Sequence, residues 1–295
     1  LWKEFKDLSE WADVIHYQFP WPFADLLALT RQSSSKSYIV SYQSDIIRQN
    51  VLNKLYQPLM NKFLDKAASV VATSQNYISS STVLSTLEQA PVFIPNGIDK
   101  ELNSDSYQKE KKEYEKLYGQ DFFLFLGVFR YYKGLNYLLK AAQQTGLDVV
   151  IGGDGPESEK LYQYVHEHNL TNVHFLGYVT EQQKHALIDL SRALILPSSE
   201  RSEAYGMVLL EAARQSTPMI STELDSGTSY INAHNETGLV IPAKNSVQLA
   251  AAMQEMTENE DMVKLMSISA KKRFENNFTG EIMGKRYAEL YHSIL

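Results

Sequence analysis

Short apolar runs alternate with longer, helix-like stretches along almost the whole chain. Several of these runs are apolar at every position, as strands buried on both faces of a parallel sheet require. A helical stretch between successive strands is the pattern of repeated β–α–β units. The sequence therefore predicts an α/β fold with parallel sheets. The predicted strands are Asp13–His16, Tyr38–Tyr42, Ser69–Thr73, Val92–Ile94, Phe122–Gly127, Asp148–Gly152, Val173–Leu176, Ala193–Leu196, Met219–Ser221 and Leu239–Ile241.

Composition narrows the class of protein and of ligand. The chain has 295 residues, 44% of them hydrophobic, which is enough for one large core or two medium ones. Its net charge of -7 argues against a general affinity for nucleic acid, so an anionic ligand would need a local cluster of donors. The absence of cysteine excludes disulfides and thiolate metal sites. This absence fits a cytoplasmic protein, which we expect. No apolar run approaches the length that spans a bilayer.

A turn followed by a polar stretch marks the best domain boundary. The turn is Pro95–Asp99, and the highly charged residues that follow it indicate a linker that leads into a solvated helix. We expect a first domain over 1–105, a second over 106–275, and a C-terminal helix over 276–295 that returns to the first domain. The apolar residues at helical spacing in this last segment are Ile282, Met283, Tyr287, Leu290, Tyr291 and Ile294.

Two glutamates eight positions apart, Glu203 and Glu211, carry the strongest functional signal. A strand that stops at Pro-Ser precedes them, and Gly206 stands near the first turn of an apolar helix. The N–H groups and positive dipole end of such a turn suit a phosphate. One carboxylate on each side of that anion suggests a bound nucleotide-sugar. In the alternative interpretation, Glu211 is only a solvent-exposed residue of a helix and Glu203 only a surface residue of a loop.

This segment resembles the E-x7-E signature of retaining glycosyltransferases of the GT-B fold, in particular glycosyltransferase family 4, of the group 1 type. The residues P-S-x-x-x-S-E-A-Y-G-x-V-L-L-E-A match closely, with Tyr205 where phenylalanine is more usual. The resemblance implies two Rossmann-like domains whose parallel sheets face a cleft. Family members begin with a strand and a glycine-rich loop, and neither is found at the start of this sequence. We therefore expect the first domain to be truncated at its N-terminus.

The resemblance also implies the roles of basic and acidic residues around the donor. Lys133 matches the family's lysine, and Arg130 stands two residues beyond the usual arginine position, at Val128. Both are expected to stabilise the leaving diphosphate and, with Glu203 facing the donor sugar, to form the catalytic set. Glu211 is expected to bind the ribose hydroxyls. The remaining expected donor-binding residues are Tyr205, Gly206, Met207, Val208, Gly153, Tyr178 and Val179.

The acceptor side departs from the family pattern at two positions. Relatives often have H-x-H where this chain has His16 followed by Gln18, and Y-H-S-D-I where it has Gln43. Glutamine keeps its hydrogen-bonding capacity but does not titrate near neutral pH. We therefore expect His16 and Gln43 on the acceptor side, with Gln43 positioning the acceptor rather than transferring a proton.

A long helix is predicted over Asp45–Lys66. It places apolar residues on one side and basic residues, Arg48 and Lys62 among them, at the polar positions. Such a helix either packs on its own sheet or lies on an anionic membrane. Both readings stay open, so peripheral contact of the first domain with the inner face of the plasma membrane is a candidate partner interaction.

Taken with the resemblance, these motifs imply a metal-independent, retaining transfer of a hexose from a GDP- or UDP-linked sugar to a glycan or lipid-linked glycan, with no cofactor. The variant R-Y-Y-K-G at Arg130–Gly134 favours mannose and a bacterial surface polysaccharide or lipopolysaccharide precursor. Two alternatives remain. One is a catalytically silent nucleotide-sugar-binding or scaffold protein, and the other is a nucleotide-sugar epimerase of the same fold.

Overall fold

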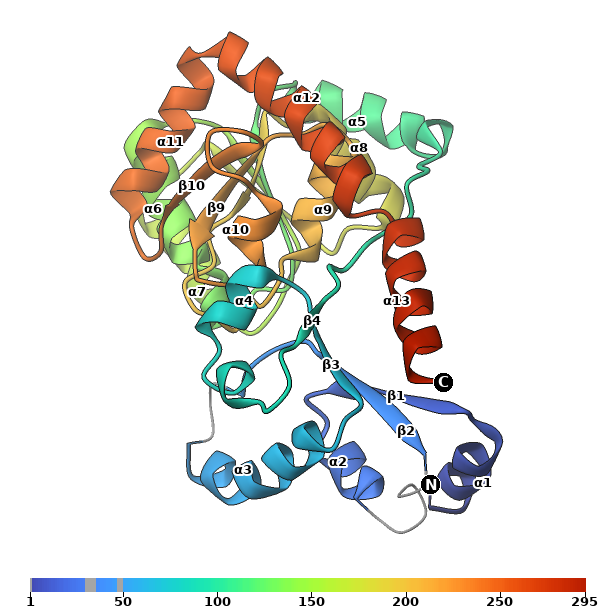
Figure 1. The fold of residues 1–295 in the computed structure, drawn as a ribbon. Helices are drawn as coiled ribbons and strands as arrows, with labels where there is room; N and C mark the ends of the chain where they lie inside the picture. Colours follow the sequence, from blue (N-terminus) through green and yellow to red (C-terminus); the bar gives the residue numbers. More distant parts are fainter. Residues whose placement is uncertain (1, 30–35, 47–49) are drawn as a thin grey trace.

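The described part of the protein contains two parallel sheets with helices packed against them (Figure 1). The computed structural model describes residues 2–29, 36–46 and 50–295. The first domain holds a sheet of order β1-β2-β3-β4, and the second holds a sheet of order β10-β9-β8-β5-β6-β7. All the strand pairs are parallel, so the predicted α/β class with two Rossmann-like domains is confirmed.

All ten predicted strands are present, with ends shifted by a few residues at most. The first sheet contains β1 (Val14–Phe19), β2 (Ser37–Tyr42), β3 (Ser69–Ala72) and β4 (Val92–Phe93). The second contains β5 (Phe123–Leu126), β6 (Val149–Gly152), β7 (Val173–Gly177), β8 (Ala193–Leu196), β9 (Met219–Glu223) and β10 (Gly238–Pro242).

Helices of the first domain are α1 (Trp2–Trp11), α2 (Pro22–Ala28), α3 (Asn50–Asp65), α4 (Gln75–Ser80) and η1 (Leu84–Thr86). Those that follow are η2 (Ser104–Tyr107), α5 (Gln108–Tyr118), η3 (Tyr131–Lys133), α6 (Leu135–Thr145), α7 (Ser158–Glu167), α8 (Glu181–Leu190), α9 (Met207–Arg214), α10 (Gly227–Ile231), α11 (Ser246–Glu258), α12 (Glu260–Asn277) and α13 (Gly280–Ile294). Within the described ranges, no helix is both long enough and apolar enough to cross a membrane.

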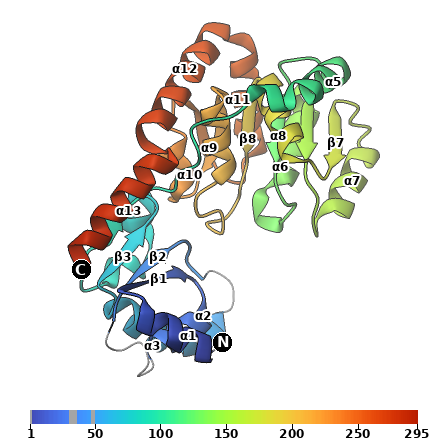
Figure 2. The same ribbon diagram turned by 90° about the vertical axis from the view of Figure 1, so that its right-hand side faces the viewer.

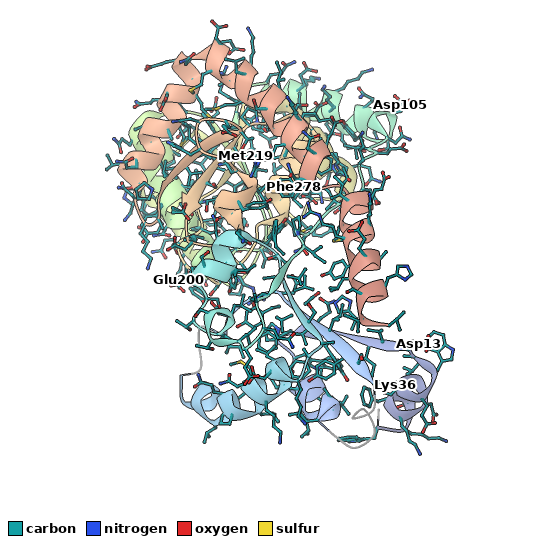
Figure 3. All side chains as sticks on the ribbon, in the orientation of Figure 1. Asp13, Lys36, Asp105, Glu200, Met219 and Phe278 are labelled. Atoms are coloured by element: carbon teal, nitrogen blue, oxygen red, sulfur yellow. The ribbon has the colours of Figure 1, made fainter. Side chains whose placement is uncertain are left out.

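Strand β5 shows why the runs in the second domain are apolar at every position. Phe123 and Phe125 pack into the core on one face of the sheet, and Leu124 and Leu126 pack into the core on the other. Successive side chains of a strand point to opposite faces, so a sheet covered by helices on both sides needs apolar residues throughout. Met219, which Figure 3 labels, is also fully buried in this domain.

The predicted helix over Asp45–Lys66 is wrong at its start. Helix α3 begins at Asn50, while Asp45 and Ile46 lie outside any helix, and 47–49, including Arg48, lie outside the described residues. The Asp45 backbone N–H donates to the Tyr77 hydroxyl, which holds this part of the chain in a loop. The apolar residues predicted on one side of this helix also differ in burial, because Phe63 is buried whereas Leu55 is 76% exposed.

The last helix runs from the second domain back to the first (Figure 2). Helix α12 ends at Asn277, so residue 275, the predicted end of the second domain, lies inside α12. The Gly280 N–H donates to the Ile98 carbonyl where the chain passes between the domains. Farther along α13, the Tyr291 hydroxyl lies 2.7 Å from His16 Nδ1. Helix α13 therefore connects the two domains on one side of the molecule.

Candidate active site

A cavity of about 720 Å³ opens between the two domains. The carboxyl ends of parallel strands meet at one edge of a sheet, and this is where open α/β sheets bind ligands. The loops that follow β5, β6, β7 and β8 line the cavity from the second domain, and residues that follow β2 and β4 line it from the first. Its wall contains Gln43, Ser44, Asn96, Gly127, Val128, Lys133, Gly153, Tyr178, Val179, Lys184, Ser202, Glu203, Tyr205, Gly206, Met207, Val208 and Glu211, among others.

Lys133 and Glu203 form an ion pair in this wall. The Lys133 ammonium donates to Glu203 Oε2 at 2.6 Å, and the Ser198 hydroxyl donates to the same oxygen at 2.8 Å. Gly134 allows this approach, because its φ is +70° and a Cβ there would overlap the Pro197 carbonyl oxygen. The loops after β5 and β8 thus touch through backbone, which brings a cation and a carboxylate from positions far apart in the sequence into contact.

The N-terminus of α9 lies next to this pair. Gly206, with φ +84°, caps the helix and contributes no side chain to the cap. The first N–H groups of a helix have no acceptor within the helix, and the dipole makes this end positive. Gly206, Met207 and Val208 all line the cavity. The cavity therefore contains a surface of backbone N–H groups that suits a phosphate.

A second ion pair, which the sequence analysis missed, joins Lys184 to Glu211. The Lys184 ammonium donates to Glu211 Oε1 at 2.7 Å and lies 2.8 Å from a carboxylate oxygen of Glu181. Burial lowers the pKa of Lys184, but the hydrogen bonds and charges of the two carboxylates outweigh burial, and the pKa lies above its usual value. In the sequence, the one sign of this pair was that Lys184 lies in the first turn of a helix that begins just after Val179, a predicted donor-binding residue.

A row of hydrogen-bonded amides reaches the cavity from the first domain's side. Gln18 Nε2 lies 3.2 Å from His16 Nε2, and Gln43 Nε2 donates to Gln18 Oε1 at 3.2 Å. Asn96 Nδ2 in turn donates to Gln43 Oε1 at 3.4 Å. An amide both donates and accepts, so each glutamine can continue the row toward the cavity. Of these residues, Gln43 and Asn96 line the cavity.

Two of the predicted site residues are not in the cavity wall. Arg130 is exposed and precedes η3, whereas Val128, the family's arginine position, is in the wall. His16, on β1, faces α13 rather than the cavity. Its Nδ1 contacts Tyr291 of that helix, and its Nε2 is 2.7 Å from the Ser41 hydroxyl. Burial lowers the pKa of His16, which favours its neutral form. The structure thus brings eleven of the thirteen predicted residues together and leaves these two outside.

In the described part of the chain, no group of three or more His, Asp or Glu side chains could hold a metal ion. Four charged side chains of the cavity form the two lysine–glutamate pairs described above, and Asp154 is a further acidic residue of its wall. Any anion bound there would meet two ammonium groups and the N-terminus of α9.

Comparison with known structures supports the fold. The structure resembles Anabaena HepE in complex with UDP, with a TM-score of 0.85 and 17% identity, covering 99% of this chain and 82% of that one. It also resembles a sucrose-phosphate synthase from Thermosynechococcus elongatus, with a TM-score of 0.81, 19% identity, and coverage of 99% and 76%. These likenesses place the protein among structures with the GT-B arrangement of two domains.

Sequence comparison identifies the family. The D-rhamnosyltransferase WbpZ of Pseudomonas aeruginosa is 44% identical over 95% of this chain and 73% of its own length. The O-antigen chain mannosyltransferase C of Escherichia coli is 40% identical over 99% of this chain and 78% of its own length. Residues 106–273 match the family described as glycosyl transferases group 1. This chain therefore belongs to the group 1 glycosyl transferases.

Proposed function

We propose that this protein is a retaining, metal-independent glycosyltransferase that moves a hexose from a nucleotide-diphosphate sugar to a glycan. The observation that carries the proposal is the arrangement of two lysine–glutamate pairs in one cavity with the N-terminus of α9. Cations and helix N–H groups suit a diphosphate, and carboxylates suit the hydroxyls of a ribose and a sugar. A nucleotide-sugar presents a ribose, a diphosphate and a sugar, with the diphosphate in the middle.

In the proposed complex, the diphosphate binds at Gly206–Val208 and Lys133. Glu211 accepts hydrogen bonds from the ribose, and Glu203 accepts them from the sugar. Lys133 then donates to the phosphates instead of to Glu203 alone, so its charge stabilises the leaving diphosphate as the bond breaks. A lysine and a helix N-terminus perform the task for which other transferases use a metal ion.

The proposed reaction occurs on one face of the sugar. The bond from C1 to the phosphate oxygen breaks, and the acceptor hydroxyl oxygen forms its bond to C1 on the same face. The acceptor's proton passes to the leaving phosphate oxygen, so no separate general base is required. This mechanism is compatible with glutamine rather than histidine at residue 43, since that residue needs only to position the acceptor.

For the transferred sugar, we propose mannose or a closely related hexose, and an O-antigen type of glycan as the acceptor. The relatives named a mannosyltransferase and a D-rhamnosyltransferase support this choice. The structures with the same fold include a complex with UDP, so a UDP-linked donor is the other candidate beside a GDP-linked one.

Calorimetry with GDP, UDP, ADP and dTDP, followed by a transfer assay with the matching mannose donor and a mannosyl glycan, tests the proposal. The anomeric configuration of the product, determined by NMR, should equal that of the donor, and EDTA should not change the rate. Nucleotide binding without transfer would identify a silent binding protein. Conversion of the donor without any acceptor would identify an epimerase. Inversion at C1, or loss of the rate with EDTA, would contradict the proposed mechanism.

A further inference from the structure

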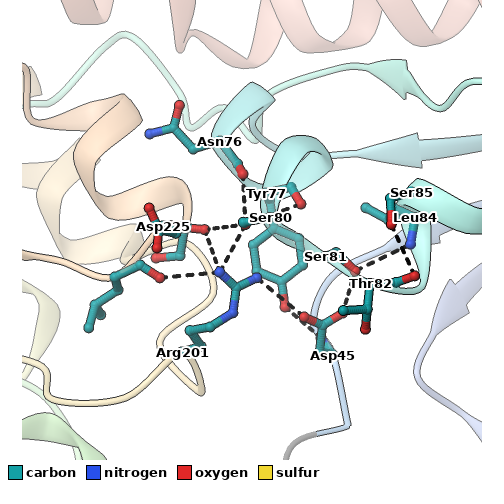
Figure 4. Close-up of polar contacts among 12 residues, drawn as sticks. Asp45, Asn76, Tyr77, Ser80, Ser81, Thr82, Leu84, Ser85, Arg201 and Asp225 are labelled. Carbon is teal, nitrogen blue, oxygen red and sulfur yellow. Dashed lines mark hydrogen bonds and ion pairs between the residues drawn. The ribbon is translucent and has the colours of Figure 1, made fainter.

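Arg201 stands two residues before Glu203, in the loop between β8 and α9, and its side chain extends to the first domain (Figure 4). Its Nη2 donates to Asp45 Oδ2 at 3.3 Å, and its Nη1 donates to the Ser80 hydroxyl at 2.8 Å. Nη1 also donates to the Asp225 carbonyl at 2.8 Å, in the loop after β9. One guanidinium thus joins both domains and a neighbouring loop of its own domain.

The acceptors around Arg201 are themselves held in place. Asp45 Oδ1 accepts from the Ser81 hydroxyl at 2.7 Å and from the Tyr42 hydroxyl at 2.9 Å, which leaves Oδ2 directed at the guanidinium. The guanidinium also lies over the Tyr77 ring, 5.0 Å from its centre. The planar, five-donor guanidinium fits such a set of fixed acceptors better than an ammonium does.

The same loops hold Glu203. The Ser226 hydroxyl donates to the Glu203 carbonyl at 2.9 Å, and Ser226 directly follows Asp225. Beyond Glu203, the Tyr205 hydroxyl donates to the Asn96 carbonyl at 3.0 Å, where the chain leaves the first domain. The segment that carries Glu203 is therefore tied to the first-domain side of the cavity both before and after this residue. Moving the domains apart would break both connections.

We propose that Arg201 is a positioning residue that couples closure of the two domains to the placement of Glu203. The inference rests on the proposed function for its consequence in catalysis. In the closed state the bonds from Arg201 to Asp45 and Ser80 keep the loop after β8 in the position where Glu203 meets the sugar. Nucleotide binding does not depend on Arg201, because Lys133, Glu211 and the N-terminus of α9 all belong to the second domain.

Arg201→Ala tests the coupling in the full chain. We expect kcat for sugar transfer to fall by about tenfold to a hundredfold, the effect of a small misplacement of reacting groups. The Kd of the free nucleoside diphosphate should stay within about twofold of the parent value, since uncoupling leaves the ground-state contacts intact. Arg192→Ala is the matched control, because Arg192 is also a mostly buried arginine, paired with Asp121 and Glu260 in the second domain. Parent kcat in Arg201→Ala, or an equal loss in Arg192→Ala, would overturn the proposal.

A double-mutant cycle with Asp45→Asn makes the test specific. Asp45→Asn alone should also lower kcat, and the double variant should be no slower than Arg201→Ala, because both changes remove the same contact. If the two losses multiply, the residues act separately and the coupling is wrong. Should Arg201→Ala fail to fold, Arg201→Lys replaces it in the cycle, since it keeps the charge and loses the fork of donors.

Small-angle scattering with the nucleoside diphosphate bound separates this inference from the proposed function. The Arg201→Ala protein should have a larger radius of gyration than the parent, and the Arg192→Ala protein should not. A parent protein that transfers no sugar would refute the proposed function, yet a wider Arg201→Ala protein would still support the role in closure. Identical scattering of Arg201→Ala and parent would refute that role.

Discussion

At the scale of single residues, the main feature is that each glutamate of the motif is paired with a lysine in the same cavity. Glu203 is 7% exposed, and its Oε2 is bound by Lys133 and Ser198. A mostly buried carboxylate needs such partners, because loss of hydration is costly for a charged group. A bound diphosphate would compete with Glu203 for the Lys133 ammonium. Diphosphate binding would therefore weaken this ion pair.

Substitution Glu203→Gln should reduce catalysis without weakening nucleotide binding. Removing the negative charge takes a strong acceptor from the sugar hydroxyls, and we expect kcat to fall by about a hundredfold to a thousandfold. The affinity for the free diphosphate should be equal or higher, because Lys133 no longer has a carboxylate partner there. Calorimetry and initial rates measure both quantities. Glu200→Gln, in the same loop, is the matched control, and the hypothesis fails if the two variants have the same kcat.

Glu211→Ala should weaken binding of the free nucleoside diphosphate. Each hydrogen bond lost from a charged group costs roughly 1.5–3 kcal/mol, and these losses are not additive. Lys184→Met should have a similar effect if Lys184 orients the Glu211 carboxylate, and the double variant should then bind no more weakly than Glu211→Ala. Calorimetry measures all three. Lys160→Met, which alters an exposed pair with Glu157, is the control. Undiminished affinity in Glu211→Ala would contradict the ribose assignment.

At the scale of elements, the site depends on how closely the turn after β5 approaches the end of β8. The contact is made by Gly134 backbone against the Pro197 carbonyl, with no room for a side chain. Since Lys133 directly precedes this glycine, the spacing between the two loops decides whether its ammonium reaches Glu203. Residue 134 must therefore lack a side chain for two reasons: the backbone contact with Pro197 leaves no room for one, and this contact places the Lys133 ammonium at Glu203.

The substitution Gly134→Ala should both destabilise the protein and lower kcat. The overlap with Pro197 adds to the cost of a positive φ, which by itself is about 1–3 kcal/mol. Gly146→Ala is a matched control, because Gly146 has the same φ of +70° and no atom within 4 Å of the added Cβ. Urea unfolding should show a larger loss of stability for Gly134→Ala, and only this variant should lose activity. Equal stability losses in the two variants would show that the loop contact is not tight.

At the scale of the whole molecule, α13 and the Arg201 contacts hold the two domains from different places. Helix α13 contacts the first domain through a cluster in which His16 bonds to Tyr291 and Ser41. Burial favours the neutral form of His16, so its lowered pKa makes the docking of α13 sensitive to acid. Unfolding exposes the ring to water, where a histidine takes up a proton more readily.

The pH dependence of stability should reflect this histidine. A group whose pKa is lowered in the folded state binds more protons when unfolded, so stability falls as pH drops below about 6.5, the usual value for histidine. In His16→Gln this loss between pH 7.5 and about 5 should be smaller, as measured by urea unfolding. His292→Gln, at an exposed position of α13, should lose as much as the parent. A parent-like loss in His16→Gln would show that His16 is not responsible.

The linear sequence was sufficient for every strand and for most of the predicted residues that line the cavity. A strand such as β5, which is buried on both faces, can be predicted from a short run of apolar residues alone. Glu203, Gly206 and Glu211 lie within one strand–loop–helix unit, so their spacing along the chain already decides how they lie in space. Motifs of this kind are readable because their geometry is local.

Only the tertiary structure decided which side chains meet across that unit. The partners of the two glutamates, Lys133 and Lys184, are 70 and 27 positions away along the chain, so no local spacing determines these distances. The same is true of Arg201, whose contacts with the first domain span more than a hundred positions, and of His16, which α13 covers from the other end of the chain. Long-range contacts depend on how the sheets and domains pack. For this reason the sequence could name most of the residues that line the cavity but could not show how the domains hold them together.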